Sequence, residues 1–337
     1  MIREATEALI AGKHLSQEEA AAVMGEIMEG QATPAQLAGF LVALRIKGET
    51  VDEIAGFAQV MRDKALRVPF DGSTVDTCGT GGDGSGTFNI STAAAFVVAG
   101  AGLTVAKHGN RAASSQCGSA DVLEALGVKL ELTPEQVAAC MKEAGIGFMF
   151  APAFHPSMRH AGPTRRELGI RTVFNILGPL TNPAGAQAQV LGVGSDGLLP
   201  KMAAALQRLG SRHALVVHSS DGLDEISISG PTRVYECRGE ALRDYVVRPE
   251  DVGLAPAPQA AIKGGTPQEN ARILRALLQG ARGPVRDVVL LNAGAALLAG
   301  DAASDLKEGV ALAQQALDSG RALEKLEALV RVSQRFA

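Results

Sequence analysis

Five glycines crowd one short stretch of this chain and constrain its fold more than any other feature. They stand at positions 79, 81, 82, 84 and 86, in a run that begins at Asp76 and continues to Thr92. A strand-like segment precedes them, and a helical run of small residues over 93–102 follows. Glycines let backbone N–H groups approach anionic oxygens, and a helix N-terminus adds free donors and partial positive charge. The stretch, which we call the glycine loop (residues 79–92), therefore predicts a site for a phosphate-bearing ligand.

The glycine loop matches neither of the common nucleotide-binding motifs. A Walker A loop needs a Lys after its glycines, and none follows here, nor is there a clean GxGxxG fingerprint. A purely structural turn is the alternative interpretation. Asp83 would repel a phosphate unless it binds a ribose hydroxyl, a backbone amide or a metal-bound water.

Composition narrows the classes of partner. The chain has 337 residues, of which 46% are hydrophobic, so one large domain or two linked ones with a sizeable core can form. A net charge of −4 and the absence of a long basic run argue against nucleic-acid binding. The four cysteines show no CxxC or Cys/His spacing typical of zinc, and we interpret them as reduced thiols of a cytoplasmic protein. The N-terminus has no apolar signal core and no stretch suits a membrane span, so we expect no membrane partner.

Residues 1–70 have the pattern of a small helical bundle. Three capping boxes predict helix starts, and glycines at 30 and 48 stand where helices end. Apolar spacing over 37–44 fits one buried helical face. The three boxes are Ser16 with Glu19, Thr33 with Gln36, and Thr50 with Glu53.

From about residue 72, short β-rich runs alternate with helical ones. Such alternation predicts a mostly parallel sheet covered by helices. The fold class that follows is α/β, with a small N-terminal helical bundle domain and a larger α/β domain around a mostly parallel central sheet. The predicted strands are 74–78, 103–106, 128–132, 147–150, 189–194, 214–218, 233–236, 245–248 and 288–291, and the predicted helices include 91–101, 120–126, 137–144, one opening at Thr266 and a strongly helical stretch over 305–332.

Residues 151–186 interrupt this alternation of strands and helices, and we call them the connecting segment. A proline-rigid stretch over 151–156 is followed by a cationic helical run over 159–176, which 177–183 ends. We expect the segment to cross back to the bundle. The predicted domains are therefore 1–70 with a returning segment at about 159–186, and 72–158 together with 187–337.

Three polar loops each follow a predicted strand: the glycine loop, residues 107–119 and residues 219–225. Loops after parallel strands emerge at one edge of a sheet, where open α/β folds bind ligands, so the three can meet around one ligand. In the second loop, cations combine with small hydroxyls, which suits a phosphate or diphosphate, although a solvated basic turn is the alternative. Its polar side chains are Lys107, His108, Asn110, Arg111, Ser114, Ser115 and Ser119.

The third loop places Asp224 beside Glu225. In a turn after Gly222 the two carboxylates can diverge and bridge two cations, and Mg²⁺ prefers a few carboxylates together with waters and phosphate oxygens. Opposite two phosphate loops, the pair fits a Mg²⁺–diphosphate, although an isolated Asp-Glu pair is usually surface charge. Among the arginines at 159, 165, 166 and 171, one facing the cleft could hold a substrate carboxylate, while solvated arginines are the default.

Taken together, these residues resemble the anthranilate phosphoribosyltransferase family of tryptophan biosynthesis, in the nucleoside phosphorylase and phosphoribosyltransferase superfamily. The likeness covers essentially the whole chain. The Lys107 loop alone is less specific, because pyrimidine nucleoside phosphorylases carry a similar one. The motifs are Asp76-Thr-Cys-Gly-Thr-Gly-Gly-Asp83, Asn89-Ile-Ser-Thr92, Lys107-His-Gly-Asn-Arg111 through Ser119-Ala-Asp-Val-Leu, His155-Pro, Arg165-Arg-Glu-Leu-Gly-Ile-Arg-Thr, Asn175-Ile-Leu-Gly-Pro-Leu-Thr-Asn-Pro183 and Asp221-Gly-Leu-Asp-Glu225.

The resemblance implies a glycosyltransferase that moves the phosphoribosyl group of phosphoribosyl pyrophosphate to the amine of anthranilate and releases diphosphate. It implies an active site at the hinge between the two domains, two Mg²⁺ ions per subunit and a homodimer formed through the helical domain. The implied donor-binding residues are Gly79, Gly82, Asp83, Thr87, Asn89, Ile90, Ser91, Thr92, Lys107, Ser115 and Ser119. The implied anthranilate-binding residues are Gly79, Asn110 and Arg165, and the implied metal ligands are Ser91, Asp224 and Glu225.

Physical reasoning supplies roles for these groups. Mg²⁺ and Lys107 would stabilise the departing diphosphate, while ribose C1 becomes oxocarbenium-like and the amine attacks from the opposite face. Positioning and charge stabilisation should dominate, with His108 as the nearest candidate base.

Three alternatives remain at this point. A pyrimidine nucleoside phosphorylase would use inorganic phosphate, but the 175–183 segment and the Asp224-Glu225 pair argue against it. A regulator would bind the donor without turnover. A related transferase would act on another aromatic amine.

Overall fold

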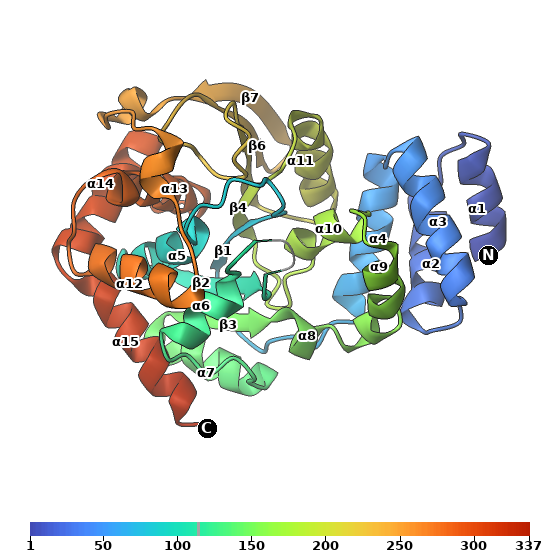
Figure 1. Cartoon of the computed structure of the whole chain (residues 1–337), viewed down its shortest axis with the longest axis horizontal. Coiled ribbons are helices and arrows are strands. Elements are labelled where there is room, and N and C mark those ends of the chain that lie inside the picture. The colour runs from blue at the N-terminus through green and yellow to red at the C-terminus, as the bar shows by residue number, and fades with distance from the viewer. Residues whose placement is uncertain (113–114) are drawn as a thin grey trace.

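Four helices at the N-terminus pack into a bundle: α1 (Ile2–Ile10), α2 (Gln17–Met28), α3 (Pro34–Lys47) and α4 (Val51–Asp63). The computed structural model describes residues 1–112 and 115–337. All three predicted capping boxes are present. Glu53 also pairs with Lys47 at 2.6 Å and accepts from the Leu15 N–H at 2.9 Å, so one buried carboxylate ties together the starts of α2 and α4 and the end of α3. Figure 1 shows the bundle at one end of the molecule.

A seven-stranded sheet forms the centre of the larger part. Its strands lie in the order β3-β2-β1-β4-β5-β6-β7. The first five pair in parallel and the last two antiparallel, so the predicted mostly parallel sheet is confirmed. The strands are β1 (Thr74–Gly79), β2 (Thr104–Gly109), β3 (Ile146–Phe150), β4 (Ala188–Gly192), β5 (His213–Ser219), β6 (Thr232–Arg238) and β7 (Ala241–Val247).

The strand order reverses between β1 and β4. The chain moves outward from β1 through β2 to β3, and then returns to the other side of β1 as β4. In open α/β sheets, ligands bind at the carboxyl ends of the strands at such a switch point. The glycine loop leaves β1 at this place, so the topology puts it at the mouth of the crevice.

The two faces of the sheet belong to two different hydrophobic cores. Leu215 and Val217 of β5 face the first core, whereas Ala214 and Val216 face the second, because side chains alternate along a strand. The first core is closed by α5 (Ile90–Gly100), α6 (Ser119–Ala125), α7 (Pro134–Ala144), α12 (Pro267–Leu278), α13 (Pro284–Ala299), α14 (Leu306–Asp318) and α15 (Arg321–Gln334).

The second core is continuous with the helical bundle. It contains apolar side chains of α1 to α4 together with Leu199, Met202 and Leu206 of α11 (Leu199–Arg208), which packs on β5 and β6. The bundle is therefore seated on the second face of the sheet through α4 and α11.

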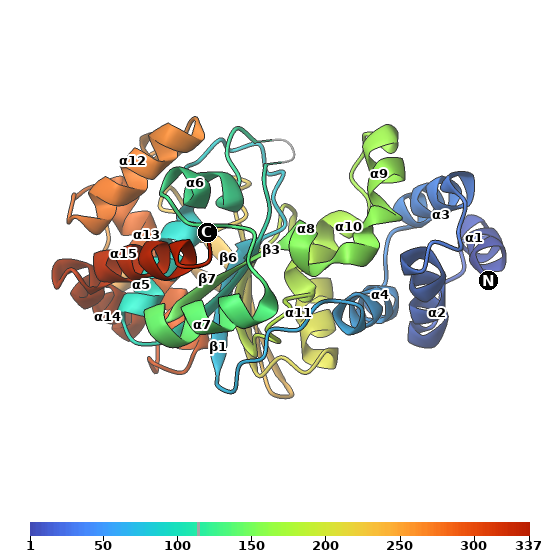
Figure 2. The ribbon, with the colours of Figure 1, turned by 90° about the horizontal axis from the view of Figure 1, so that it is seen from below.

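The connecting segment contributes to this second core. It forms α8 (Ala151–Phe154), α9 (Gly162–Leu168) and α10 (Phe174–Leu177), and α9 packs on α3 while α10 packs on α4. Figure 2 shows these short helices between the sheet and the bundle. The prediction of one helical run over 159–176 is wrong: α9 ends at Gly169, whose φ of 62° is left-handed, and residues 170–173 are not helical.

Two predicted strands are absent. Residues 288–291 lie inside α13, because a short apolar run does not separate a buried strand from a buried helix. Residues 128–132 show the alternating burial of a strand but pair with none; the Lys129 N–H donates instead to Ser333 Oγ at 3.1 Å. Among the described residues, no helix is long and apolar enough to cross a membrane.

Candidate active site

Asp224 lies over the carboxyl ends of β1 and β4, at the point where the strand order reverses. Its Oδ2 accepts a hydrogen bond of 2.7 Å from the Gly81 N–H. A Cβ at Gly79 would overlap the Asp224 side chain, and one at Gly192 would overlap its backbone carbonyl. Both strands therefore end in glycine, because only glycine leaves room for Asp224, its carboxylate over β1 and its backbone over β4.

The three predicted loops do meet. Glu225 Oε1 accepts from the Ser91 N–H at 3.1 Å, in the first turn of α5. Lys107 Nζ, from the end of β2, donates to Thr77 O at 2.5 Å and lies 3.4 Å from Ser91 Oγ. The structure thus brings Ser91, Lys107 and Glu225 together from three loops that are far apart in sequence.

Charge is unbalanced in this cluster. Burial raises the pKa of Asp224 well above its usual value, and repulsion from Glu225 and Asp83 raises it further. Burial also raises the pKa of Glu225 to about 7, against the attraction of Lys107. Burial lowers the pKa of Lys107 itself. Carboxylates thus outnumber the single ammonium, and desolvation makes their charge costly.

This donor set fits a hard divalent cation. Mg²⁺ binds carboxylate and hydroxyl oxygens, usually through one or two protein carboxylates with waters and substrate phosphates completing its shell. Within the described part of the chain, no three His, Cys, Asp or Glu side chains gather closely enough to hold a metal by themselves. Asp224, Glu225 and Ser91 therefore suit a cation that arrives with a phosphate ligand.

Asp83 is held within the glycine loop. Its Oδ1 accepts from the Ser85 N–H at 3.1 Å, so its partner is a backbone amide, one of the three alternatives foreseen for it. Thr87 lies nearby, with its hydroxyl 3.3 Å from Ser85 Oγ. Gly82, in the same loop, packs against Arg171.

The start of α5 carries three further predicted donor-site residues. Asn89 precedes the helix, and its side chain bonds to Cys117 O at 3.1 Å and to Asn270 at 2.9 Å, which joins the glycine loop to the second loop and to α12. Ile90 is buried. Thr92 Oγ1 is buried with no hydrogen-bond partner among the described residues.

The second loop is only partly gathered at the site. Ser119 begins α6, and its hydroxyl lies 3.4 Å from Asn110 O, so these two predicted residues are neighbours. Ser115 is exposed, and Ser114 lies outside the described residues. Arg111, expected to serve a phosphate, instead pairs with Asp121 at 3.0 Å and Glu124 at 2.7 Å.

His108 packs against His155, with ring centroids 5.0 Å apart. Burial lowers the pKa of His108 to about 3, helped by repulsion from His155, and burial lowers the pKa of His155 to about 4. The Nε2 atoms of both rings are buried and have no partner among the described residues. Two neutral imidazoles therefore offer unpaired ring nitrogens here.

The four arginines of the connecting segment differ sharply. Arg165 is half-buried over the Phe174 ring at 5.0 Å, burial lowers its pKa, and it forms no ion pair with any described residue. Arg171 donates to Gly81 O at 2.7 Å. Arg159 and Arg166 are exposed.

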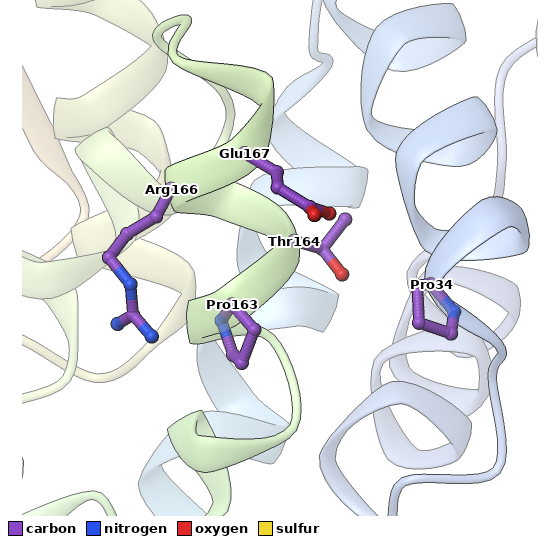
Figure 3. Close-up of a pocket in the computed structure, with 5 residues that line it drawn as sticks. All are labelled: Pro34, Pro163, Thr164, Arg166 and Glu167. Carbon is purple, nitrogen blue, oxygen red and sulfur yellow. The ribbon is translucent and has the colours of Figure 1, made fainter.

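A separate open cavity of ≈ 550 Å³ lies between α3 and α9. It is lined by Pro34, Pro163, Thr164, Arg166 and Glu167, and Figure 3 shows Arg166 pointing away from the side of α3. None of the predicted site residues lines it.

Sequence reasoning assigned no role to two groups at the site. Asp76 is fully buried in β1, where burial raises its pKa to about 6, and it accepts from Asn182 Nδ2 at 2.7 Å. Asn182 also donates to Ala106 O at 2.8 Å, so it joins the connecting segment to β1 and β2. A carboxylate inside an apolar strand was a usable signal for Asp76. Asn182 stands in the family-like motif that ends at Pro183, but nothing in that motif indicated its partner.

Comparison with known proteins assigns the chain to a family. Residues 3–65 match the glycosyl transferase family, helical bundle domain, and residues 71–323 match the glycosyl transferase family, a/b domain. The chain is 65% identical to anthranilate phosphoribosyltransferase of Chloroflexus aggregans over 98% of both sequences.

Two solved structures extend the likeness. The crystal structure of anthranilate phosphoribosyltransferase from Thermus thermophilus superposes with a TM-score of 0.93 at 52% identity, covering 98% of this chain and 99% of that one. The Saccharomyces cerevisiae enzyme in complex with PRPP and Mg superposes with a TM-score of 0.92 at 30% identity, covering 99% and 98%.

Replacing His108 with Gln is expected to weaken the loss of stability at acid pH. The folded chain keeps His108 and His155 neutral, whereas an unfolded histidine takes up a proton near pH 6.5. Below pH 6.5 the unfolded chain therefore binds more protons, so stability present above that pH is lost as pH falls toward the folded pKa values. Each ring contributes up to about 1.4 kcal/mol per pH unit.

Urea unfolding of wild type and His108→Gln, from about pH 7 to about pH 5, checks this. Parallel stability curves for His108→Gln and wild type would show that the ring is not held neutral.

Proposed function

The chain belongs to the anthranilate phosphoribosyltransferase family, and we propose that it catalyses the Mg²⁺-dependent transfer of the phosphoribosyl group from phosphoribosyl pyrophosphate to the amine of anthranilate. The products are N-(5-phosphoribosyl)anthranilate and diphosphate, in tryptophan biosynthesis. One observation carries the proposal: the Asp224-Glu225 pair lies at the switch point of the sheet, against both the glycine loop and the start of α5.

The donor lies along the carboxyl edge of the sheet in this proposal. Backbone N–H groups of the glycine loop and of the first turn of α5 receive its phosphates, and the unpaired Thr92 hydroxyl is a further donor. The contacts are Gly79, Gly82, Asp83, Thr87, Asn89, Ile90, Ser91, Thr92, Lys107, Ser115 and Ser119.

Two Mg²⁺ ions per subunit accompany the donor. Ser91 and Glu225 would hold one, and Asp224 and Glu225 would hold the other. When bound, the ions neutralise charge that develops on the departing diphosphate. They also offset the carboxylate excess of the cluster, since a nearby cation lowers the cost of ionising Asp224 and Glu225.

Lys107 is the fixed positive charge of the protein itself. Its ammonium is held by Thr77 O and lies beside Ser91 Oγ, so it is preorganised rather than mobile. A buried ammonium stabilises a developing anion without solvent reorganisation. Lys107 therefore helps the diphosphate leave as the bond to ribose C1 breaks.

Anthranilate enters from the connecting segment. The Arg165 guanidinium is desolvated and has no carboxylate partner among the described residues, so a substrate carboxylate would satisfy it through charge-assisted hydrogen bonds. Asn110 and Gly79 complete the acceptor contacts. In this proposal the amine attacks the face of ribose C1 opposite the departing diphosphate, which inverts the anomeric centre.

In this proposal His108 positions the anthranilate amine and does not remove its proton. A ring whose pKa is about 3 is too weak a base to hold a proton at neutral pH. Its Nε2 has no partner among the described residues but is enclosed, so an amine N–H would reach it only once the site opens. An aromatic amine attacks as the neutral species and loses its proton afterwards, so positioning is sufficient.

The oligomeric state is a further part of the proposal. Ile10 and Ile46, on the helical bundle, are 74% and 81% exposed. Single exposed apolar side chains are also normal on monomers, so the expectation of a dimer comes from the family rather than from these two residues. We expect a homodimer through the helical domain, and a cytoplasmic location.

The loss of anthranilate fluorescence tests the function. With phosphoribosyl pyrophosphate and Mg²⁺, fluorescence should fall while equimolar diphosphate appears, and a chelator should stop both. Donor binding without diphosphate release would indicate a regulator. Phosphate-dependent cleavage of thymidine without Mg²⁺ would indicate a pyrimidine nucleoside phosphorylase.

Arg165→Ala is expected to raise the KM for anthranilate by roughly one to two decades, because a charge-assisted bond is worth about 1.5–3 kcal/mol. The KM for the donor should change little. Steady-state kinetics against Arg166→Ala, an exposed neighbour on α9, provide the check. An unchanged anthranilate KM places Arg165 outside the acceptor site.

A further inference from the structure

We propose that Arg171 is a positioning residue that holds the glycine loop in its donor-binding shape from the connecting segment, and thereby links the donor side of the cleft to the acceptor side. The inference rests on the proposed function for the identity of the two substrates. The contact between the two segments stands on the structure by itself.

Arg171 and Asp224 both form hydrogen bonds to the backbone of Gly81. Arg171 Nη1 donates to Gly81 O at 2.7 Å, while the Gly81 N–H donates to Asp224 Oδ2 at 2.7 Å. Arg171 belongs to the connecting segment, and Asp224 belongs to the loop after β5. The peptide groups on either side of Gly81 are therefore fixed between two parts of the chain that are far apart in sequence.

Few other bonds hold this part of the loop. Between positions 81 and 85, every hydrogen bond that the described residues make from outside the loop involves Arg171 or Asp224; the third is the Asp224 N–H to Asp83 at 3.5 Å. Glycines also leave the backbone free to adopt many conformations. The loop stays attached on both sides of this part, through the Thr80 N–H to Gly192 O and the Gly264 N–H to Gly86 O, each at 2.9 Å. Without the Arg171 bond, residues 81–85 between them would keep Asp224 as their one outside partner among the described residues.

Packing shows that the guanidinium lies against the loop and does not merely touch one oxygen. Gly82 has a left-handed φ of 73°, and a Cβ there would overlap Arg171 Nη1. The left-handed backbone favours glycine at 82, and the contact shows that the end of the exposed Arg171 side chain lies directly on this residue. The planar guanidinium also brings a permanent positive charge to a loop that would receive phosphates.

The backbone of Arg171 is anchored on the acceptor side. The next residue, Thr172, donates its N–H to Asn175 Oδ1 at 2.9 Å, and Val173 and Phe174 are buried in the second core. The Arg165 guanidinium lies over the Phe174 ring. A shift of this segment when anthranilate engages Arg165 would therefore be transmitted through Arg171 to Gly81.

The consequence is a specific kinetic signature. Loss of the Arg171 contact should leave the chemical groups in place but make the loop disordered before the donor binds. The KM for phosphoribosyl pyrophosphate should then rise about tenfold, with a smaller change in kcat, because donor binding must also supply the free energy that orders the loop.

The test compares Arg171→Ala, Arg171→Lys and the matched control Arg166→Ala. We expect the donor KM to rise about tenfold in Arg171→Ala and to recover in part in Arg171→Lys, whose ammonium can still donate to Gly81 O. Arg166→Ala should resemble wild type. A donor KM for Arg171→Ala within about twofold of wild type would overturn the proposal.

Hydrogen exchange of the unliganded protein separates this proposal from the proposed function. Amides of residues 81–85 should exchange faster in Arg171→Ala than in wild type, with exchange in the helical bundle unchanged. If wild type shows no transferase activity but this difference appears, the function fails and the loop contact stands. Equal exchange of residues 81–85 in both proteins would overturn the contact.

Discussion

The structure depends on an excess of negative charge at the carboxyl edge of the sheet. Asp76 is fully buried, and Asp224 and Glu225 are half-buried, around the single ammonium of Lys107; loss of water contact raises the pKa of each carboxyl group. Desolvated charges of one sign are tolerated where a ligand completes the balance. A cation carried by a diphosphate would do so.

The fold supplies that room by its topology. The strand order reverses between β1 and β4, both strands end in glycine under Asp224, and α5 begins where Glu225 can accept from Ser91. The second hydrophobic core runs from the helical bundle to the sheet and includes the connecting segment. The segment can therefore carry Arg165 and Arg171 to the cleft on a packed support rather than on a free loop.

Local signals predicted most of this architecture, and long-range contacts account for the rest. The capping boxes and the strand–helix alternation were readable because both depend on neighbours in sequence. The convergence of three loops followed from a general property of parallel sheets. The strand at 288–291 was wrong because a short apolar run has no secondary-structure preference of its own. Asn182 and the Arg171–Gly81 contact could not be predicted, since each joins residues about 90 or more positions apart.

Proton release on binding of the magnesium–donor complex tests the central claim most directly. Calorimetry in buffers of different ionisation enthalpy counts the protons released. Near pH 6.5, wild type should release more protons than Glu225→Gln, because the carboxyl group whose pKa is about 7 must ionise to receive the metal. The difference should vanish well above that pKa. Equal proton release by both proteins near pH 6.5 would contradict the account, because the raised pKa of Glu225 would then have no connection with the ligand.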